Sequence, residues 1–178
     1  RMPVGKILRP PGKPVAIHFT HGVVREFDEV VVATHSNDAL AMLGDATQKE
    51  RSVLGALPYR DNEVILHTDT RLLPKVQRAW SSWNYRLKPG SGRATVTYNM
   101  NILQGLDAPE TFCVTLNDTA SINPHRILGR FNYAHPQFTV AGMQAQQRWE
   151  DINGYNGTWF CGAYWQNGFH EDGLSSGL

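Results

Sequence analysis

The chain has 178 residues, 41% of them hydrophobic and 19% charged, which is enough to bury the core of one globular domain or slightly more. Its 17 basic and 16 acidic side chains give a formal net charge of +1, and no segment gathers Lys and Arg into a phosphate-binding face, which excludes nucleic acid as a partner. No apolar run approaches the roughly 20 residues of a membrane helix, and the N-terminus lacks a signal-peptide pattern, so the sequence predicts a soluble, cytoplasmic protein with no membrane span.

Two kinds of strand are predicted near the N-terminus. Residues 15–19 and 23–27 alternate in polarity around His21 and Gly22, which predicts a hairpin whose glycine supplies a positive φ. The run 29–34 is almost continuously apolar and predicts a strand buried on both faces, as in a parallel sheet covered by helices. The hairpin and this strand therefore belong to different sheets.

Helices and an antiparallel sheet are predicted for the middle of the chain. A short helix capped by Ser36 or Asn37 extends to Leu43, and Thr47 and Glu50 have the spacing of a capping box that begins a second helix. Period-two alternation then predicts an antiparallel meander of strands at residues 63–68, 79–87, 93–100 and 111–116.

One face of this sheet is predicted to be aromatic. A turn at residues 88–92 joins the central pair and sets Trp83, Tyr85 and Leu87 on one face, opposite Val96 and Tyr98. Two interpretations stay open: the aromatic side chains line an apolar substrate pocket, or they pack as core under helices. The residues concerned are Trp80, Trp83, Tyr85 and Tyr98.

The C-terminal third predicts helices and one further strand. Pro124 suits the first turn of a helix near Ile127, and residues 140–152 predict another helix. Residues 157–162 form a short apolar run that ends at a glycine, and a helix is predicted to begin at about His170. The fold class is therefore α+β.

The tail from Trp159 onward carries the strongest functional pattern. Gly162 follows a strand and Gly173 lies at a helix entrance, where glycine allows the backbone to approach a ligand closely and helix N–H groups can donate hydrogen bonds to a ligand oxygen. The same residues also fit a tight strand–turn–helix junction, in which Glu171 and Asp172 favour the helix N-terminus.

A family resemblance favours the first interpretation. Phe160-Cys161-Gly162, followed by Asp172-Gly173 and Ser176-Gly177, resembles the C-terminal FAD motif of flavin-containing amine oxidases. Residues 27–36 are similar to the strand that re-enters the FAD domain of that family. The segments 66–69, 80–85 and 160–165 resemble a bacterial branch of predicted NAD/FAD-binding oxidoreductases, so that the resemblance extends from about Val15 to the end of the chain.

The resemblance implies the C-terminal portion of a FAD-dependent oxidoreductase that transfers hydride from an unknown substrate to flavin. The aromatic residues suit an apolar or lipid-like substrate at least as well as a small amine. The fingerprint GxGxxG is absent, so this piece alone is expected to bind FAD weakly or not at all. Ala163 stands where amine oxidases carry an acidic residue, and Glu171 or Asp172 would replace it. The residues implied to contact FAD are Gly162, Ala163, Tyr164, His170, Glu171, Asp172 and Gly173.

The same resemblance divides the chain into three segments. Residues 1–35 form a β-ribbon and a strand of an incomplete FAD-binding domain, residues 36–154 a substrate-type domain, and residues 155–178 a returning strand with the start of a flavin-contacting helix. Because the chain opens on Arg1, it is expected to be a piece of a longer protein. Its expected partners are a small-molecule substrate and the missing N-terminal FAD-binding half, and unpaired strand edges favour self-association.

The rival hypothesis is a non-catalytic binding module that uses the aromatic sheet face. No catalytic acid or base stands out in the sequence. The serines lack the GxSxG context of a nucleophile elbow, so no catalytic nucleophile is assigned either. The histidines fall in separate predicted elements, and Cys113 and Cys161 lie far apart, so no metal site is predicted and both thiols are expected to be buried and reduced.

Overall fold

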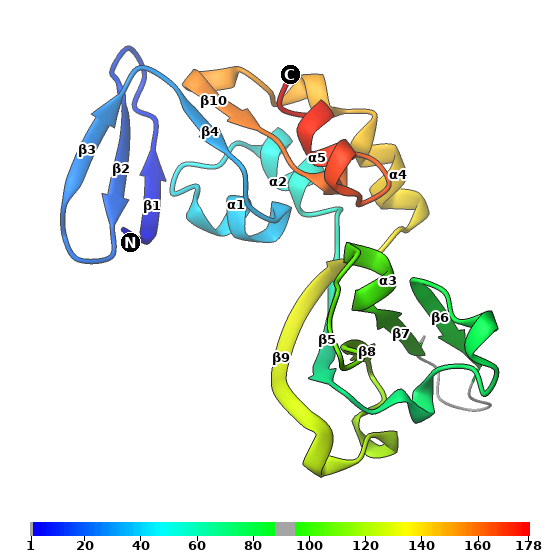
Figure 1. Ribbon diagram of the computed structural model, residues 1–178. Coiled ribbons are helices and arrows are strands. Elements are labelled where there is room, and N and C mark those ends of the chain that lie inside the picture. Colours follow the sequence, from blue (N-terminus) through cyan, green and yellow to red (C-terminus); the bar gives the residue numbers. More distant parts are fainter. Residues whose placement is uncertain (1, 88–94) are drawn as a thin grey trace. The chain divides into compact units, whose positions relative to one another are not determined.

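The computed structural model describes residues 2–87 and 95–178 (Figure 1). The chain divides into two compact units: unit 1 contains the residues up to Arg60 together with Pro136–Leu178, and unit 2 is Asp61–His135. The chain combines helices with mainly antiparallel sheets, which agrees with the α+β class. The expected substrate-type segment 36–154 thus contributes its central part to unit 2 and its two ends to unit 1.

A three-stranded antiparallel ribbon opens unit 1, with the order β1 (Val4–Leu8), β2 (Val15–Phe19) and β3 (Val24–Phe27). The hairpin predicted for the last two strands is confirmed, and Gly22 in its turn has a φ of 87°. Strand β1 was not predicted, because Gly5 and Lys6 interrupt its apolar alternation.

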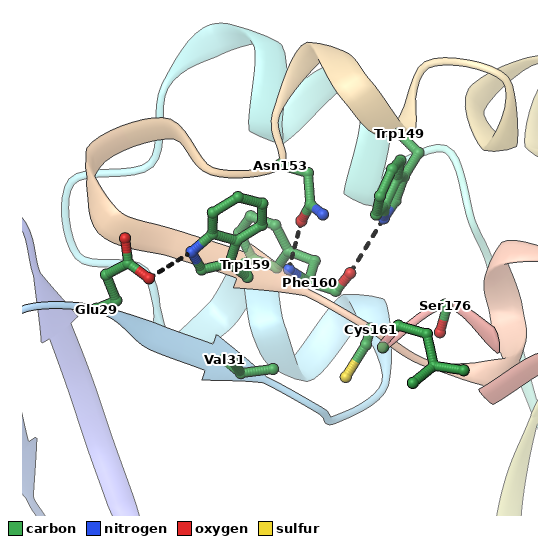
Figure 2. Close-up of a pocket in the computed structure, with 10 residues that line it drawn as sticks. Glu29, Val31, Trp149, Asn153, Trp159, Phe160, Cys161 and Ser176 are labelled. Atoms are coloured by element: carbon green, nitrogen blue, oxygen red, sulfur yellow. Dashed lines mark hydrogen bonds between the residues drawn. The ribbon is translucent and has the colours of Figure 1, made fainter. Parts of the chain in front are cut away.

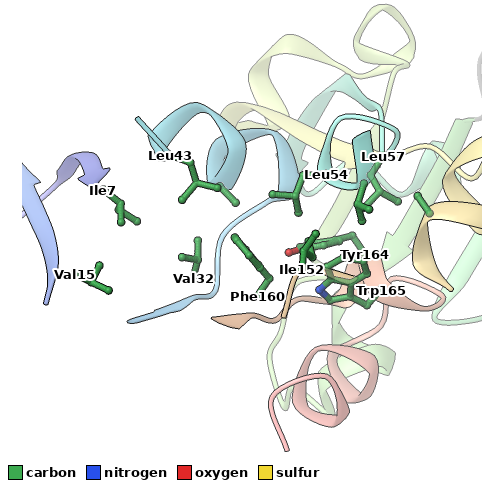
Figure 3. Packing of buried hydrophobic residues seen from close by; sticks show 13 residues of the cluster. Ile7, Val15, Val32, Leu43, Leu54, Leu57, Ile152, Phe160, Tyr164 and Trp165 are labelled. Carbon is green, nitrogen blue, oxygen red and sulfur yellow. The ribbon is translucent and has the colours of Figure 1, made fainter. Parts of the chain in front are cut away.

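A parallel pair of strands, β4 (Val30–Val32) and β10 (Thr158–Phe160), joins distant parts of unit 1. Both strands were predicted. The prediction that β4 is buried on both faces is wrong: Val32 is buried, whereas Val31 is 65% exposed. Only the face that carries Val32 and Phe160 is covered, because the helices of the unit pack on that side (Figure 3).

The core of unit 1 lies between this pair and three helices, α1 (Ser36–Met42), α2 (Gln48–Leu54) and α4 (Val140–Gln146). The capping box of α2 is confirmed, with Thr47 and Glu50 each accepting from the other's backbone. The first helix begins after His35, so neither predicted cap residue caps it through its side chain. Helix α4 ends six residues before the predicted end, at Gln146, and a 3-10 turn follows.

A buried ion pair fastens the end of β1 to α2. Arg9 is 5% and Glu50 1% exposed, and their side chains form two hydrogen bonds, of which Nη2 to Oε2 measures 2.9 Å. Arg9 also reaches Asp45, with Nε 2.9 Å from Oδ1. Burial acts to raise the pKa of Glu50, but the hydrogen bonds from Arg9 and Thr47 outweigh it and hold that pKa below its usual value. The carboxylate therefore stays charged inside the fold.

Unit 2 contains a five-stranded sheet in the order β6-β7-β8-β5-β9. The prediction of a simple meander is therefore correct only for β6, β7 and β8. The first strand of the series does not pair with the second: β5 pairs with β8, from Val64↔Leu116 to His67↔Cys113, because a long connection carries the chain past the sheet before β6. The strands are β5 (Tyr59–His67), β6 (Trp83–Arg86), β7 (Thr95–Asn99), β8 (Cys113–Leu116) and β9 (Ile127–Pro136).

The predicted pairing of the two central strands is confirmed, and the structure sets Trp83 opposite Tyr98 and Tyr85 opposite Val96. The turn predicted at residues 88–92 lies outside the described residues. Pro124 does begin a helical turn, although it is of the 3-10 type. The remaining helices are α3 (Met100–Gln104) and α5 (His170–Ser175), and the 3-10 turns are η1 (Thr70–Leu72), η2 (Gln77–Ala79), η3 (Thr119–Ser121), η4 (Pro124–Arg126), η5 (Trp149–Asp151), η6 (Tyr155–Gly157) and η7 (Ala163–Trp165).

A series of hydrogen-bonded polar side chains lies on the buried face of this sheet. His67 is fully buried; its Nδ1 accepts the backbone N–H of Asp69 at 3.0 Å, so Nε2 carries the proton and donates to Thr115 Oγ1 at 2.8 Å. Thr115 Oγ1 lies 2.8 Å from Thr97 Oγ1. Burial lowers the pKa of His67, although the carboxylate of Asp69 works in the opposite direction. The native state therefore holds this imidazole neutral.

This burial predicts that the chain loses stability as the pH falls below about 6.5, the ordinary pKa of histidine. Unfolded His67 binds a proton that the folded state excludes, so the free energy of unfolding should decrease by up to about 1.4 kcal/mol per pH unit. Urea unfolding at a series of pH values measures this slope. His67→Gln should flatten the slope and the exposed control His125→Gln should retain it, whereas an unchanged slope in His67→Gln would contradict the assignment.

Both cysteines are free thiols, as expected. Cys113 is fully buried, and this burial raises its pKa to about 11, while Cys161 is half-buried. None of the helices in the described part of the chain has the length and apolar character needed to cross a membrane.

Candidate functional site at the carboxyl edge of the parallel pair

The parallel pairing of β4 and β10 brings two distant loops to one edge. Because the strands are parallel, their carboxyl ends lie at the same edge, and the hydrogen bond from Cys161 N to Val32 O (3.2 Å) continues the pairing there. The chain leaves this edge through His35 on one strand and through Gly162 and Ala163 on the other. Ligands of open α/β sheets bind outside the carboxyl ends of strands, so this edge is the candidate site.

His35 is a residue of this edge that was not predicted as a site residue. Its ring stacks on Tyr59, with the centroids 4.5 Å apart, and Tyr59 Oη accepts the backbone N–H of Ser36 at 3.1 Å. Tyr59 also contributes to the raised pKa of Tyr164, whose main cause is burial, so Tyr59 lies near the loop after β10. Only the parallel pairing could reveal that His35 and Gly162 share an edge.

Helix α5 packs tightly against the Gly162–Ala163 turn. Gly162 N donates to Ser176 Oγ at 2.8 Å, and the Ser176 hydroxyl donates to Gly173 O at 2.8 Å. A Cβ on Gly173 would lie 3.6 Å from Ala163 N, which is an ordinary contact distance, so a methyl group fits there and any longer side chain would start from a position already in contact with Ala163. Three of the predicted residues, Gly162, Ala163 and Gly173, are thus brought together, and Ser176 is an addition to them.

Two predicted site residues, Asp172 and Tyr164, make contacts that stabilise the fold. Asp172 is 8% exposed, and its Oδ2 accepts the backbone N–H groups of Phe169 (2.8 Å) and Asn167 (3.2 Å). Tyr164 is 3% exposed and belongs to the hydrophobic core, and this burial raises its pKa. His170 and Glu171 are exposed on the first turn of α5. Of the two acidic candidates, Glu171 therefore has the carboxylate that solvent and ligands can reach.

A cleft opens on the uncovered face of the parallel pair (Figure 2). Its volume is about 280 Å³, slightly below the roughly 300–1,000 Å³ of small-molecule pockets. Trp159 lies over it and donates from Nε1 to Glu29 Oε2 at 3.2 Å. Trp149 Nε1 donates to Phe160 O at 3.1 Å, and Asn153 Oδ1 accepts from Phe160 N at 2.6 Å. These bonds fix the strand, while the face beside it stays open.

The residues of this edge fit part of a flavin dinucleotide. Gly162 and Ala163 present backbone with almost no side chain, and Glu171 offers a carboxylate that could accept from a ribityl or ribose hydroxyl. The chain contains no GxGxxG turn, the arrangement whose amides hold a pyrophosphate. The edge therefore suits the flavin and sugar end of such a cofactor and lacks the pyrophosphate anchor.

The aromatic residues that were predicted to line a pocket in unit 2 differ in their exposure and contacts. Trp83 and Tyr98 meet edge to face with ring centroids 6.0 Å apart, and Trp83 and Tyr85 are 55% and 63% exposed. Trp80 is half-buried and donates from Nε1 to Pro74 O at 2.8 Å, which fixes the loop before β6. Within the described residues, no three His, Cys, Asp or Glu side chains lie close enough to share a metal ion.

No protein-family model matches the sequence, and no curated protein matches it either. Several solved structures have the same fold. The CLA-producing fatty acid isomerase from P. acnes aligns with a TM-score of 0.66 and 17% identity, over 98% of this chain and 45% of that enzyme. A protein from Exiguobacterium sp. 255-15, assigned as a protoporphyrinogen oxidase, aligns with a TM-score of 0.65 and 14% identity, over 98% and 44%.

Reduced UDP-galactopyranose mutase aligns with a TM-score of 0.60 and 10% identity, over 92% of this chain and 41% of that protein. At these identities the likeness concerns the fold, and the chain spans less than half the length of each of the three proteins. We conclude that the chain has the fold of part of these larger enzymes.

Proposed function

We propose that the chain is the C-terminal portion of a FAD-dependent oxidoreductase of the flavin-containing amine oxidase type. The observation that carries this proposal is the β4–β10 pair: a parallel pair with one covered face, one open face and a glycine turn at its carboxyl edge. Such a pair is expected inside a larger sheet, because parallel sheets are normally covered on both faces. The missing N-terminal half would supply the remaining strands and the pyrophosphate anchor.

The residues of the edge have separate roles in this proposal. Gly162 and Ala163 let the flavin approach the backbone, Glu171 accepts from a sugar hydroxyl, and His170 and His35 are imidazoles placed to polarise the flavin or steer the substrate. Tyr164 and Asp172 keep the turn and α5 in shape. When bound, FAD would accept a hydride from the substrate, and the protein would position both partners.

The fold does not determine which substrate is oxidised. The three similar structures are an isomerase, an oxidase and a mutase, so one architecture serves different reactions. Exposed Trp83 and Tyr85 favour an apolar substrate. The same exposure is the observation that favours the rival function, a non-catalytic module that binds through this face, and bound flavin in the longer protein would distinguish the two.

Enlarging Gly173 tests the site directly. In the longer protein, Gly173→Leu should push α5 away from the Gly162–Ala163 turn and cause most of the flavin to be lost on purification, because the added side chain meets Ala163. The ratio of flavin absorbance to protein absorbance measures retention.

Gly173→Ala is the matched control, since a Cβ there makes only ordinary contacts. It should retain flavin and gain slightly in helix propensity. Full flavin retention in a folded Gly173→Leu variant would contradict the assignment of α5 and the Gly162–Ala163 turn to the cofactor site.

A further inference from the structure

A second cleft lies beside the edge strand β6, entirely within unit 2. Its volume is about 550 Å³, well inside the roughly 300–1,000 Å³ of small-molecule pockets. The lining comes from two described stretches of chain, residues 71–79 around η1 and η2 and residues 81–87 around β6. The cleft is thus built from neighbouring parts of the sequence.

The charge of this lining is of one sign. It contains Arg71, Lys75 and Arg86 and no carboxylate. Arg71 Nη2 lies 2.5 Å from Asp69 Oδ2, and Arg86 Nη1 lies 3.5 Å from Asp118 Oδ2; both aspartate side chains are 2% exposed. Among the described residues, Lys75 has no carboxylate within ion-pair distance. The cleft therefore has a net positive charge, centred on Lys75.

The rest of the lining is largely apolar. Trp83 and Tyr85 lie at alternate positions of β6, the 80%-exposed Leu87 directly follows that strand, and Leu73 and Pro74 belong to the same cleft. A row of large apolar side chains in contact with water is unfavourable unless something covers it, and such patches commonly mark binding sites.

We propose that this cleft binds a single-chain amphipathic carboxylate. The alkyl chain lies against Trp83, Tyr85 and Leu87, and the carboxylate pairs with Lys75. A neutral alkyl ligand would leave the cations unused, an alkyl amine would be repelled by them, and a small hydrophilic anion would leave the apolar row exposed. As an assignment of substrate class this inference rests on the proposed function, whereas the binding itself requires no flavin.

Titration calorimetry of the 178-residue chain tests the binding. Octanoate, decanoate and dodecanoate should bind with affinity that rises about twofold to fourfold for each CH₂ group. Decanoate should bind about fivefold more tightly than decanol and more tightly still than decylamine, because one partly exposed charge pair contributes about 1 kcal/mol. Anionic phospholipid vesicles form a second arm, which distinguishes a free carboxylate from a membrane headgroup.

Two exposed positions separate the charge from the apolar contact. Lys75→Met should weaken decanoate about fivefold and leave decanol unchanged, whereas Leu87→Ser should weaken both ligands. The matched control Lys13→Met removes an exposed lysine of unit 1 and should change neither affinity. Far-UV circular dichroism verifies that each variant is folded.

Three results would overturn the proposal: equal affinity for decanoate and decylamine, unchanged decanoate affinity in Lys75→Met, or binding to anionic vesicles without binding to decanoate. Flavin in the longer protein together with no decanoate binding would reject the substrate class and leave the oxidoreductase assignment standing. Decanoate binding with no flavin in the longer protein would support the cleft and reject the oxidoreductase.

Discussion

Replacing Glu50 with glutamine should lower the free energy of unfolding by about 3 kcal/mol, because it removes the buried carboxylate that pairs with the Arg9 guanidinium and leaves only the partly exposed carboxylate of Asp45 beside it. Arg9 and Glu50 are 5% and 1% exposed, and Glu50 also accepts from Thr47 N at 2.6 Å, so one change breaks the ion pair and weakens the cap of α2. Urea unfolding at neutral pH, followed by circular dichroism, measures the loss.

Two variants provide the comparison for Glu50→Gln. Arg51→Gln changes an exposed residue of the same helix and should alter the free energy of unfolding by less than about 0.5 kcal/mol. The double change Arg9→Met with Glu50→Leu removes both buried charges and should recover much of the loss. If Glu50→Gln cost no more than Arg51→Gln, the ion pair could not be what fastens the ribbon to α2.

Phe160→Ala should also cost about 3–5 kcal/mol, since Phe160 is fully buried in the core of unit 1 (Figure 3). The strand that carries it leads directly into Gly162, so loosening β10 should also speed amide exchange at Gly162, whose N–H is bound to Ser176. Urea unfolding and hydrogen exchange measure the two effects.

The neighbouring residue supplies the control for Phe160. Trp159 points to the open face, is 39% exposed, and Trp159→Ala should cost about 1 kcal/mol. Equal losses for the two variants would mean that the covered and open faces of β10 are equally important, which would contradict the one-sided core.

Local features of the fold could be predicted from the sequence. The hairpin around Gly22 and the capping box of Thr47 and Glu50 depend on residues a few positions apart, and both were found as expected. The pairing of the strand that carries Trp83 with the strand that carries Tyr98 followed from their alternation and from the turn predicted between them. Each of these depends on backbone preference or on side-chain periodicity, which the sequence displays directly.

Long-range features could not be predicted in this way. Strand β9 was missed because it lies at a sheet edge, where none of its side chains is fully buried and no apolar alternation is required. The placement of β5 beside β8 depends on the path of the connection between β5 and β6. The exposure of Val31 depends on which elements cover the parallel pair, and the apolar sequence of β4 gives no information on this.

The candidate site also combines local features that could be predicted with long-range features that could not. The glycine turn at Gly162 was visible because glycine has a local meaning, whereas His35 joins the edge only through the pairing of β4 with β10. Asp172 and Glu171 look equivalent in the sequence, but the fold buries the first against backbone amides and exposes the second. Lys75 could not be distinguished from other lysines until the cleft beside β6 was formed.

We propose that this chain is part of a flavin enzyme whose pyrophosphate anchor lies outside these 178 residues. The most direct measurement is the visible absorbance spectrum of the longer protein, purified beside the 178-residue chain. Flavin bands in the longer protein and none in the chain are the predicted result. Absence of flavin from both, after incubation with FAD, would contradict the claim.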